Sequence, residues 1–178
     1  MKKIKDKKKY NLNWIITVTI LAFIISVVMS FISEIVLNNV GIVIAVLITL
    51  IFIALGIIFD IIGVSVTAGN IKVFNSMSSK KVKGASIAVR LISNASKVSS
   101  VCCDVIGDVC GVASGSAGVV IATLLITKYN CNALIVSILT TAIISMLTIG
   151  GKAIGKGFAI NKSTYIINKV SRLLAVFK

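Results

Sequence analysis

GIVIAVLITLIFIALGIIFDII, residues 41–62, is the most apolar stretch of this chain and holds a single ionisable residue, Asp60. A helix of 22 residues reaches about 33 Å at 1.5 Å per residue, which is enough to cross the hydrocarbon layer of a bilayer. The stretch therefore predicts a transmembrane helix. It also places a carboxyl group near one end of that helix.

Three further apolar runs, at residues 14–32, 100–126 and 133–149, extend this prediction to the whole chain. The 178 residues are 57% hydrophobic and have a mean hydropathy of +1.07. We expect an all-α membrane protein with four transmembrane helices and no separate soluble domain. The first run follows a basic head as in a signal peptide, but it is long and lacks an A-x-A ending, so we expect an uncleaved helix.

The remaining segments carry helical patterns that suit the membrane surface. In residues 70–98, apolar residues recur at helical spacing on both sides of Gly84, which predicts a juxtamembrane pair of amphipathic helices. GGKAIGKG, residues 150–157, is expected to end the pattern of the fourth crossing. A C-terminal amphipathic helix is predicted beyond it. Its apolar face would hold Ile166, Val170, Leu173, Leu174 and Phe177.

The basic residues predict the topology. The chain has 19 Lys and Arg against 5 Asp and Glu. Six of the basic residues lie in the head, none in the first turn, six in the central segment, one in the second turn and six in the tail. Because cytoplasmic flanks carry the excess of Lys and Arg, we expect four crossings of the plasma membrane with both termini cytoplasmic.

The same charge indicates the partners. The basic residues lie between the apolar runs, so anionic lipid headgroups are their expected counterpart. Aromatic residues make up 6% and fall mostly inside the apolar runs. We therefore do not expect nucleic-acid binding, which needs aromatic side chains interleaved with basic ones.

The cysteines and the missing histidines argue against an enzyme. The sequence contains no histidine to activate a cysteine nucleophile, so we expect no catalytic residue and no cofactor. Adjacent Cys102 and Cys103 would point to different sides of a helix and do not form a CxxC pair. We expect the cysteines to be buried as small apolar residues. The four are Cys102, Cys103, Cys110 and Cys131.

Three carboxylates are predicted to lie at one depth, near the cytoplasmic ends of the second and third crossings. Ionisable residues inside a membrane are costly and commonly functional, and oxygen ligands suit hard divalent cations. Asp104 and Asp108 are four residues apart and share a helix face. We expect these groups, with nearby hydroxyls, to form a metal site. The candidate ligands are Asp60, Asp104, Asp108, Ser65 and Ser100.

Two other interpretations stay open. Lys97, Lys152 and Lys156 are expected at the same depth, and salt bridges from them would neutralise the carboxylates without transport. A proton relay is a further alternative. Glycines at four-residue spacing, Gly107 and Gly111 among them, predict a close helix contact within one chain or along a homodimer seam.

Three segments carry a resemblance to a known family. An apolar helix ends in FDIIGVSVTA (59–68), a basic amphipathic pair ends in KVSSVC (97–102), and the last crossing ends in TIGGKAIGKGFAINKS (148–163). Their order resembles the membrane domain of the CorB/CorC and cyclin M (CNNM) magnesium transporters, over about residues 42–174. The resemblance implies a three-helix core within residues 40–178, preceded by a basic head and an additional helix in residues 1–39. We expect no CBS or C-terminal soluble domain.

The resemblance implies transport or export of Mg²⁺ or Co²⁺ by a homodimer with an inward-facing ion site. The third helix of that family typically ends in F-G-E-x-x-P-K. In this chain Lys152 stands in place of the acid and Gly155 in place of the proline. The alternative function is therefore a degenerate, non-transporting scaffold or partner subunit in which lysines occupy the ion site.

Overall fold

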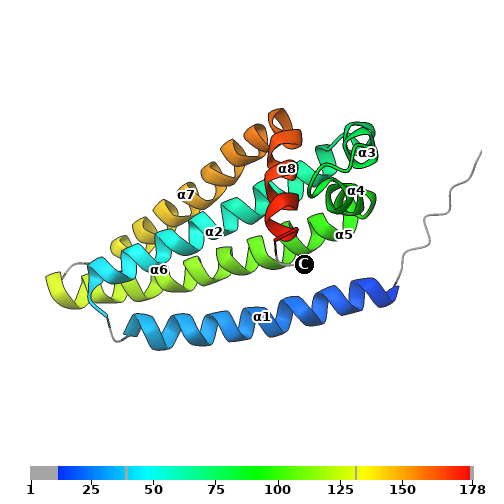
Figure 1. Ribbon diagram of the computed structural model, residues 1–178. Coiled ribbons are helices and arrows are strands. Elements are labelled where there is room, and N and C mark those ends of the chain that lie inside the picture. Colours follow the sequence, from blue (N-terminus) through cyan, green and yellow to red (C-terminus); the bar gives the residue numbers. More distant parts are fainter. Residues whose placement is uncertain (1–11, 39, 131, 177–178) are drawn as a thin grey trace, which may run out of the picture.

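The computed structural model describes residues 12–38, 40–130 and 132–176, and this part of the chain is helical without strands. Four long apolar helices run side by side (Figure 1). They are α1 (Leu12–Asn38), α2 (Ile42–Ala68), the continuous unit α5 (Ala95–Ser99), η1 (Ser100–Gly107) and α6 (Asp108–Tyr129), and α7 (Ala133–Asn161). The protein is an all-α membrane protein, as predicted, because each unit is long and apolar enough to cross a bilayer.

The helix α6 lies at the centre of the bundle and packs against α1, α2 and α7. Its buried side includes small residues such as Ala113, Ser114 and Ala117, which bring the neighbouring helices close. Large apolar side chains of α1, α2 and α7 point outward instead. An outward apolar surface of this kind suits lipid acyl chains rather than water.

Two glycines of α2 bring it against the third crossing. A Cβ atom on Gly56 would lie 3.2 Å from Cys110 Cβ and 3.3 Å from the carbonyl oxygen of Gly107. Two turns further along α2, a Cβ on Gly63 would collide with the sulfur of Cys103. The two helices are therefore antiparallel neighbours in close contact, with Cys110 buried and Cys103 half-buried between them.

The opening of the third crossing is π-helical over Ser100–Gly107, which the sequence spacing did not predict. A π-helix bonds each N–H to the carbonyl five residues back and has a wider turn. Both Cys102 and Cys103 stand beside Gly63 in this wider turn, rather than on separate sides. Both are free thiols and half-buried, so the expected full burial holds only for Cys110, and Cys131 lies outside the described residues.

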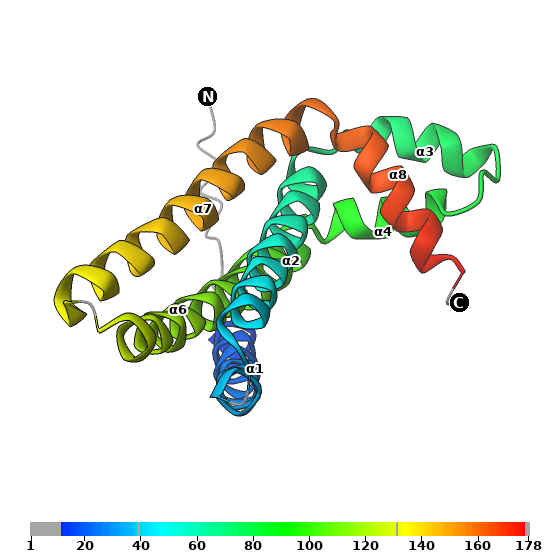
Figure 2. The same ribbon diagram turned by 90° about the vertical axis from the view of Figure 1, so that its left-hand side faces the viewer.

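The predicted amphipathic helices are present as α3 (Ile71–Ser79), α4 (Ala85–Ser93) and α8 (Ser163–Leu174). They lie across the long helices at one end of the bundle (Figures 1 and 2). A small core of Val66, Phe74, Ala88 and Ile167 joins them to the end of α2. Gly84 has the positive φ of 86° that favours glycine, so the α3–α4 turn needs it.

The expected break at GGKAIGKG was wrong, because α7 continues through residues 150–157 to Asn161. Each glycine costs a helix about 1 kcal/mol relative to alanine. Here the missing side chains are what allows α7 to lie on α2. A Cβ on Gly155 would stand 2.9 Å from Ile61 Cγ1, and one on Gly151 would collide with Ile57.

The apolar face of α8 is rotated from the expected one. Ile166, Ile167 and Ser171 are buried against the rest of the chain. Leu173 and Leu174, expected on the packed face, are 57% and 44% exposed. The expected apolar residue Phe177 lies outside the described residues.

Candidate functional site

Asp60 is a buried carboxylate in the interior of α2. The helix continues to Ala68, so Asp60 lies two turns before its end, and the residue is only 3% exposed. Within the described chain, its Oδ2 atom has no hydrogen-bond partner. Lys156 Nζ of α7 lies 3.7 Å from that oxygen, too far for a good hydrogen bond but close enough for charge attraction. The lysine therefore offsets part of the cost of burying this charge.

Asp108 forms the shorter ion pair. It is the first residue of α6, and its Oδ1 accepts a hydrogen bond from Lys152 Nζ of α7 at 2.9 Å. In this pair the lysine is the more buried partner, because its side chain is 18% exposed and that of the aspartate is 68% exposed. Lys152 thus extends through the contact between helices to reach a carboxylate at its edge. A charge-assisted bond of this length is the strongest polar contact between these two helices.

The two ion pairs share one geometric origin. Lys152 and Lys156 are four residues apart on α7, each directly following a glycine that packs on α2. Residues four apart share a helix face. The glycines bring the α7 backbone close to α2, and the lysines beside them then reach aspartates on α2 and α6. The pattern G-K-x-x-G-K therefore combines close packing with charge neutralisation.

The other expected ligands do not converge on these two aspartates. Asp104 is exposed on η1, and no hydrogen bond or ion pair of its side chain is found within the described residues. Ser65 is fully buried, and its hydroxyl donates to the Ile61 carbonyl at 2.7 Å while lying 3.3 Å from that of Ala159. Ser100 is half-buried at the start of η1.

The predicted set of three carboxylates is not assembled into one metal site. In the described part of the chain, no three Asp, Glu, Cys or His side chains come together in a group that could hold a metal ion. Asp60 and Asp108 instead each face a different lysine. The geometry thus corresponds to the interpretation in which tethered ammonium groups neutralise the carboxylates.

Lys97 has a partner that sequence reasoning missed. Its expected depth suits a counter-ion for the aspartates, but its Nζ lies 5.1 Å from the centroid of the Trp14 ring. A cation over an aromatic face is attracted by the ring quadrupole. This contact joins α5 to the start of α1. The predicted topology could have suggested it, because both residues were expected at the same end of the bundle.

One backbone contact also went unpredicted. The thiol of Cys103 lies 3.7 Å from the carbonyl oxygen of Asp60 and at the same distance from the hydroxyl of Ser99. It shows that Asp60 and the start of the third crossing lie at the same level, as the topology predicted.

No match was found when the chain was compared with known protein families, curated protein sequences and solved structures.

Proposed function

We propose that this protein is a non-transporting membrane scaffold or partner subunit in which lysines occupy the positions that a transported cation would take. The observation that supports this is the pair of contacts from Lys152 to Asp108 and from Lys156 to Asp60. A divalent cation would have to displace both ammonium groups to gain both carboxylates.

Divalent cation transport, of Mg²⁺ or Co²⁺, is the second candidate, and one observation favours it. The Oδ2 atom of Asp60 is buried and lacks a hydrogen bond within the described residues, while the side chain of Lys156 is 53% exposed. A half-exposed lysine can swing outward at low cost. Asp60 would then be a carboxylate facing the interior of the bundle, which is typical of ion pathways.

The membrane location, the topology and the oligomeric state are part of the same proposal. The distribution of basic residues supports plasma-membrane insertion with both termini cytoplasmic, at a surface of anionic lipid. A homodimer is also proposed, because Gly111 and Gly115 of α6 have nothing within 4 Å of the position of a Cβ. Such open small residues would allow a helix of a second copy to approach closely.

The test is the dependence of unfolding temperature on Mg²⁺, with NaCl of equal ionic strength as the reference. The wild type and Asp104→Asn should show the same small, non-specific response to millimolar MgCl₂. Removing both lysines, in Lys152→Ala/Lys156→Ala, should create a Mg²⁺-specific stabilisation because the carboxylates lose their tethered cations. A Mg²⁺-specific shift in the wild type that disappears in Asp60→Asn would contradict the scaffold proposal and support transport.

A flux measurement separates the two functions directly. Wild-type protein in liposomes loaded with a Mg²⁺-sensitive dye should give the rate of protein-free liposomes. A rate above that of the protein-free liposomes, lost in Asp60→Asn, would establish transport. The Asp104→Asn variant is the matched control, because its carboxylate is exposed and lies outside the two lysine–aspartate pairs.

A further inference from the structure

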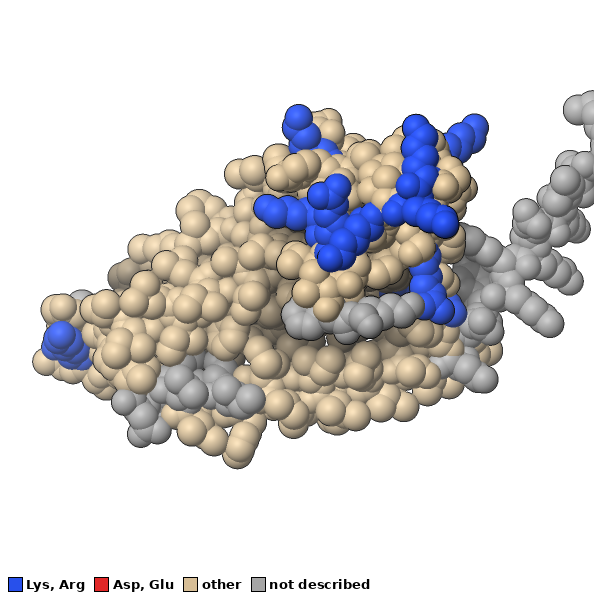
Figure 3. Space-filling view, in the orientation of Figure 1, with Lys and Arg blue, Asp and Glu red and all other residues tan. Residues whose placement is uncertain are grey.

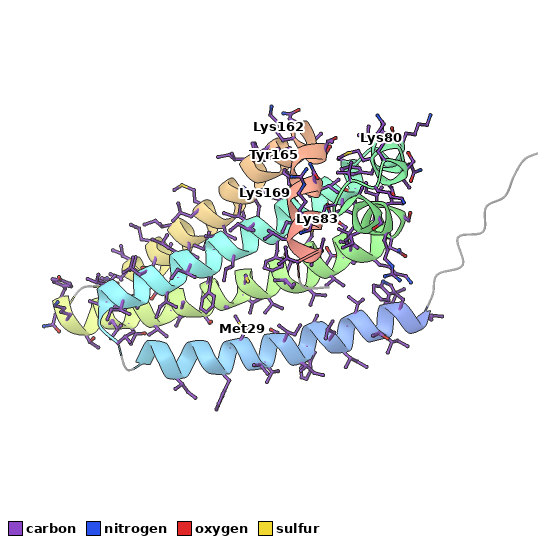
Figure 4. All side chains as sticks on the ribbon, in the orientation of Figure 1. Met29, Lys80, Lys83, Lys162, Tyr165 and Lys169 are labelled. Carbon is purple, nitrogen blue, oxygen red and sulfur yellow. The ribbon has the colours of Figure 1, made fainter. Side chains whose placement is uncertain are left out.

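A groove lies at the corner where the membrane-crossing helix α7 meets the surface helix α8. Phe158, Lys162 and Tyr165 line it, and its volume is about 260 Å³. Lys169 adds a second cation, since its Nζ lies 6.0 Å from the centroid of the Tyr165 ring. Figure 4 shows Lys162, Tyr165 and Lys169 following one another along α8. The corner thus combines two ammonium groups with two aromatic rings.

These residues share a face for a simple reason. Tyr165 and Lys169 are four residues apart on α8, which is the spacing of one helix face, and Lys162 is the cap residue just before α8 that lines the groove with Tyr165. The opposite face of α8 carries Ile167 and Ser171, which are 1% and 0% exposed. Packing of that face against α2 and α4 turns Tyr165 and Lys169 outward. Tyr165 is accordingly 62% exposed and available to a ligand.

The surroundings of the groove select an anion. Neither residues 69–94 nor residues 161–178 contain an Asp or Glu. A Cβ atom on Gly84 would lie 3.1 Å from backbone atoms of Ser171 and Arg172, so the α3–α4 turn lies directly on α8. The turn brings Lys83 toward α8, as Figure 4 shows. Figure 3 shows basic side chains gathered over this end of the molecule, with no acidic side chain visible on that face.

One wall of the groove is apolar and continues into the membrane-facing surface of α7. Phe158 is 52% exposed, and Ile154, one turn earlier, is 79% exposed. Aromatic side chains are enriched at the level of lipid headgroups, and lysines there extend their ammonium groups toward the polar layer. The groove therefore suits a ligand with an anionic head and an apolar tail.

We propose that the α7–α8 groove binds one anionic phospholipid. Its phosphate contacts Lys162 and Lys169, and its acyl chains lie along Phe158 and Ile154. The groove includes neither Asp60 nor Asp108, so the site is present whether the protein transports cations or acts as a scaffold. A result that contradicts lipid binding would therefore leave the proposed function untouched, and a result that contradicts the proposed function would leave the lipid site untouched.

Native mass spectrometry of the full chain in detergent tests the proposal, with phosphatidylglycerol and phosphatidylcholine as probes. The wild type should retain phosphatidylglycerol in preference to phosphatidylcholine. Each lysine near an anionic surface contributes about fivefold in affinity, so Lys162→Gln/Lys169→Gln should weaken phosphatidylglycerol binding about 25-fold. Phe158→Ser should weaken it without any change in net charge.

The matched control is Lys80→Gln/Lys81→Gln, which removes the same charge. Figure 4 shows Lys80 away from the α7–α8 corner, so this variant should keep its affinity within about twofold. Circular dichroism should show every variant folded. Equal losses in the two double variants would overturn the proposal in favour of diffuse attraction. Equal retention of the two lipids, or competition by glycerol phosphate at the same concentration as phosphatidylglycerol, would overturn it as well.

Discussion

The two halves of α7 meet the bundle in opposite ways. Toward α8, glycines place α7 directly on α2, and two lysines reach carboxylates of neighbouring helices. Toward Asn132, α7 carries branched apolar side chains interspersed with Ser and Thr, and a groove of about 230 Å³ remains between α2, α6 and α7. Thr49, Thr140 and Ile144 are among the residues that line this groove. Close contact of α7 with α2 and charge pairing thus occur together at one end, while the other end leaves space for apolar atoms between α7 and α2.

The difference shows how a membrane helix can carry charge. A lysine is costly in the hydrocarbon layer unless a carboxylate lies within reach. Glycine at the preceding position shortens the distance that the lysine has to cover. In the other half of α7, the hydroxyls of Thr140 and Thr141 bond to carbonyls of their own helix, so these two groups need no partner on α2.

Filling the close contact should have the largest effect. Gly155→Leu should lower the free energy of unfolding by about 3 kcal/mol, because overpacking forces α7 away from Ile57 and Ile61. Titration with sodium dodecyl sulfate in mild detergent would measure it. Gly157→Leu is the control, since a Cβ there has nothing within 4 Å. Equal losses in both variants would show that helix propensity, and not the contact, decides the result.

Removing the lysine beside the buried carboxylate should rank second. Lys156→Ala leaves Asp60 buried without a counter-ion and should cost about 2 kcal/mol. This figure lies below the range for fully buried pairs because Lys156 is half-exposed. In a double-mutant cycle measured by the same titration, Lys156→Ala should cost much less in the Asp60→Asn background. The same cost in both backgrounds would refute the coupling.

The exposed ion pair should matter less, despite its shorter distance. Lys152→Ala should lower the free energy of unfolding by less than about 1 kcal/mol, because Asp108 is largely exposed and screened. Unfolding titrations at low salt and in about 1 M NaCl would check this, since screening should reduce the difference. A salt-independent loss larger than that of Lys156→Ala would reverse the order of the two pairs.

Enlarging a side chain in the groove should have the smallest effect. Thr140→Ile should change the free energy of unfolding by less than about 0.5 kcal/mol, as most substitutions do at sites without tight packing. The same titration applies. A loss comparable to that of Gly155→Leu would mean that the groove is closed in the membrane, and the contrast between the two halves of α7 would fail.

Much of the fold could be predicted from sequence because hydropathy and turn chemistry act locally. The four apolar crossings and the amphipathic pair around Gly84 follow from short-range patterns, although α1 continues to Asn38, beyond residue 32 where the predicted run ends. The continuation of α7 through residues 150–157 could not be predicted in this way. Local propensity disfavours a helix there, and the packing of Gly151 and Gly155 on α2 overrides it.

The sequence predicted the depth of the aspartates in the membrane, but not which lysine pairs with which aspartate. Antiparallel crossings were expected to bring Asp60 to the level of the third crossing, and its contact with Cys103 agrees with that. Which lysine faces which aspartate depends on the rotation of each helix about its axis. The π-helical turn at Ser100–Gly107 changes that rotation, and helical periodicity contains no signal for it.

By itself, the sequence determined that this chain forms apolar helices long enough to cross a membrane, with basic amphipathic segments between and after them. These properties follow from transfer free energies of side chains, which need no knowledge of neighbours. Only the tertiary structure decided that Lys152 and Lys156 neutralise Asp108 and Asp60. The reason is distance: electrostatic pairing requires atoms within about 4 Å, and only the glycine contact of α7 with α2 brings them there.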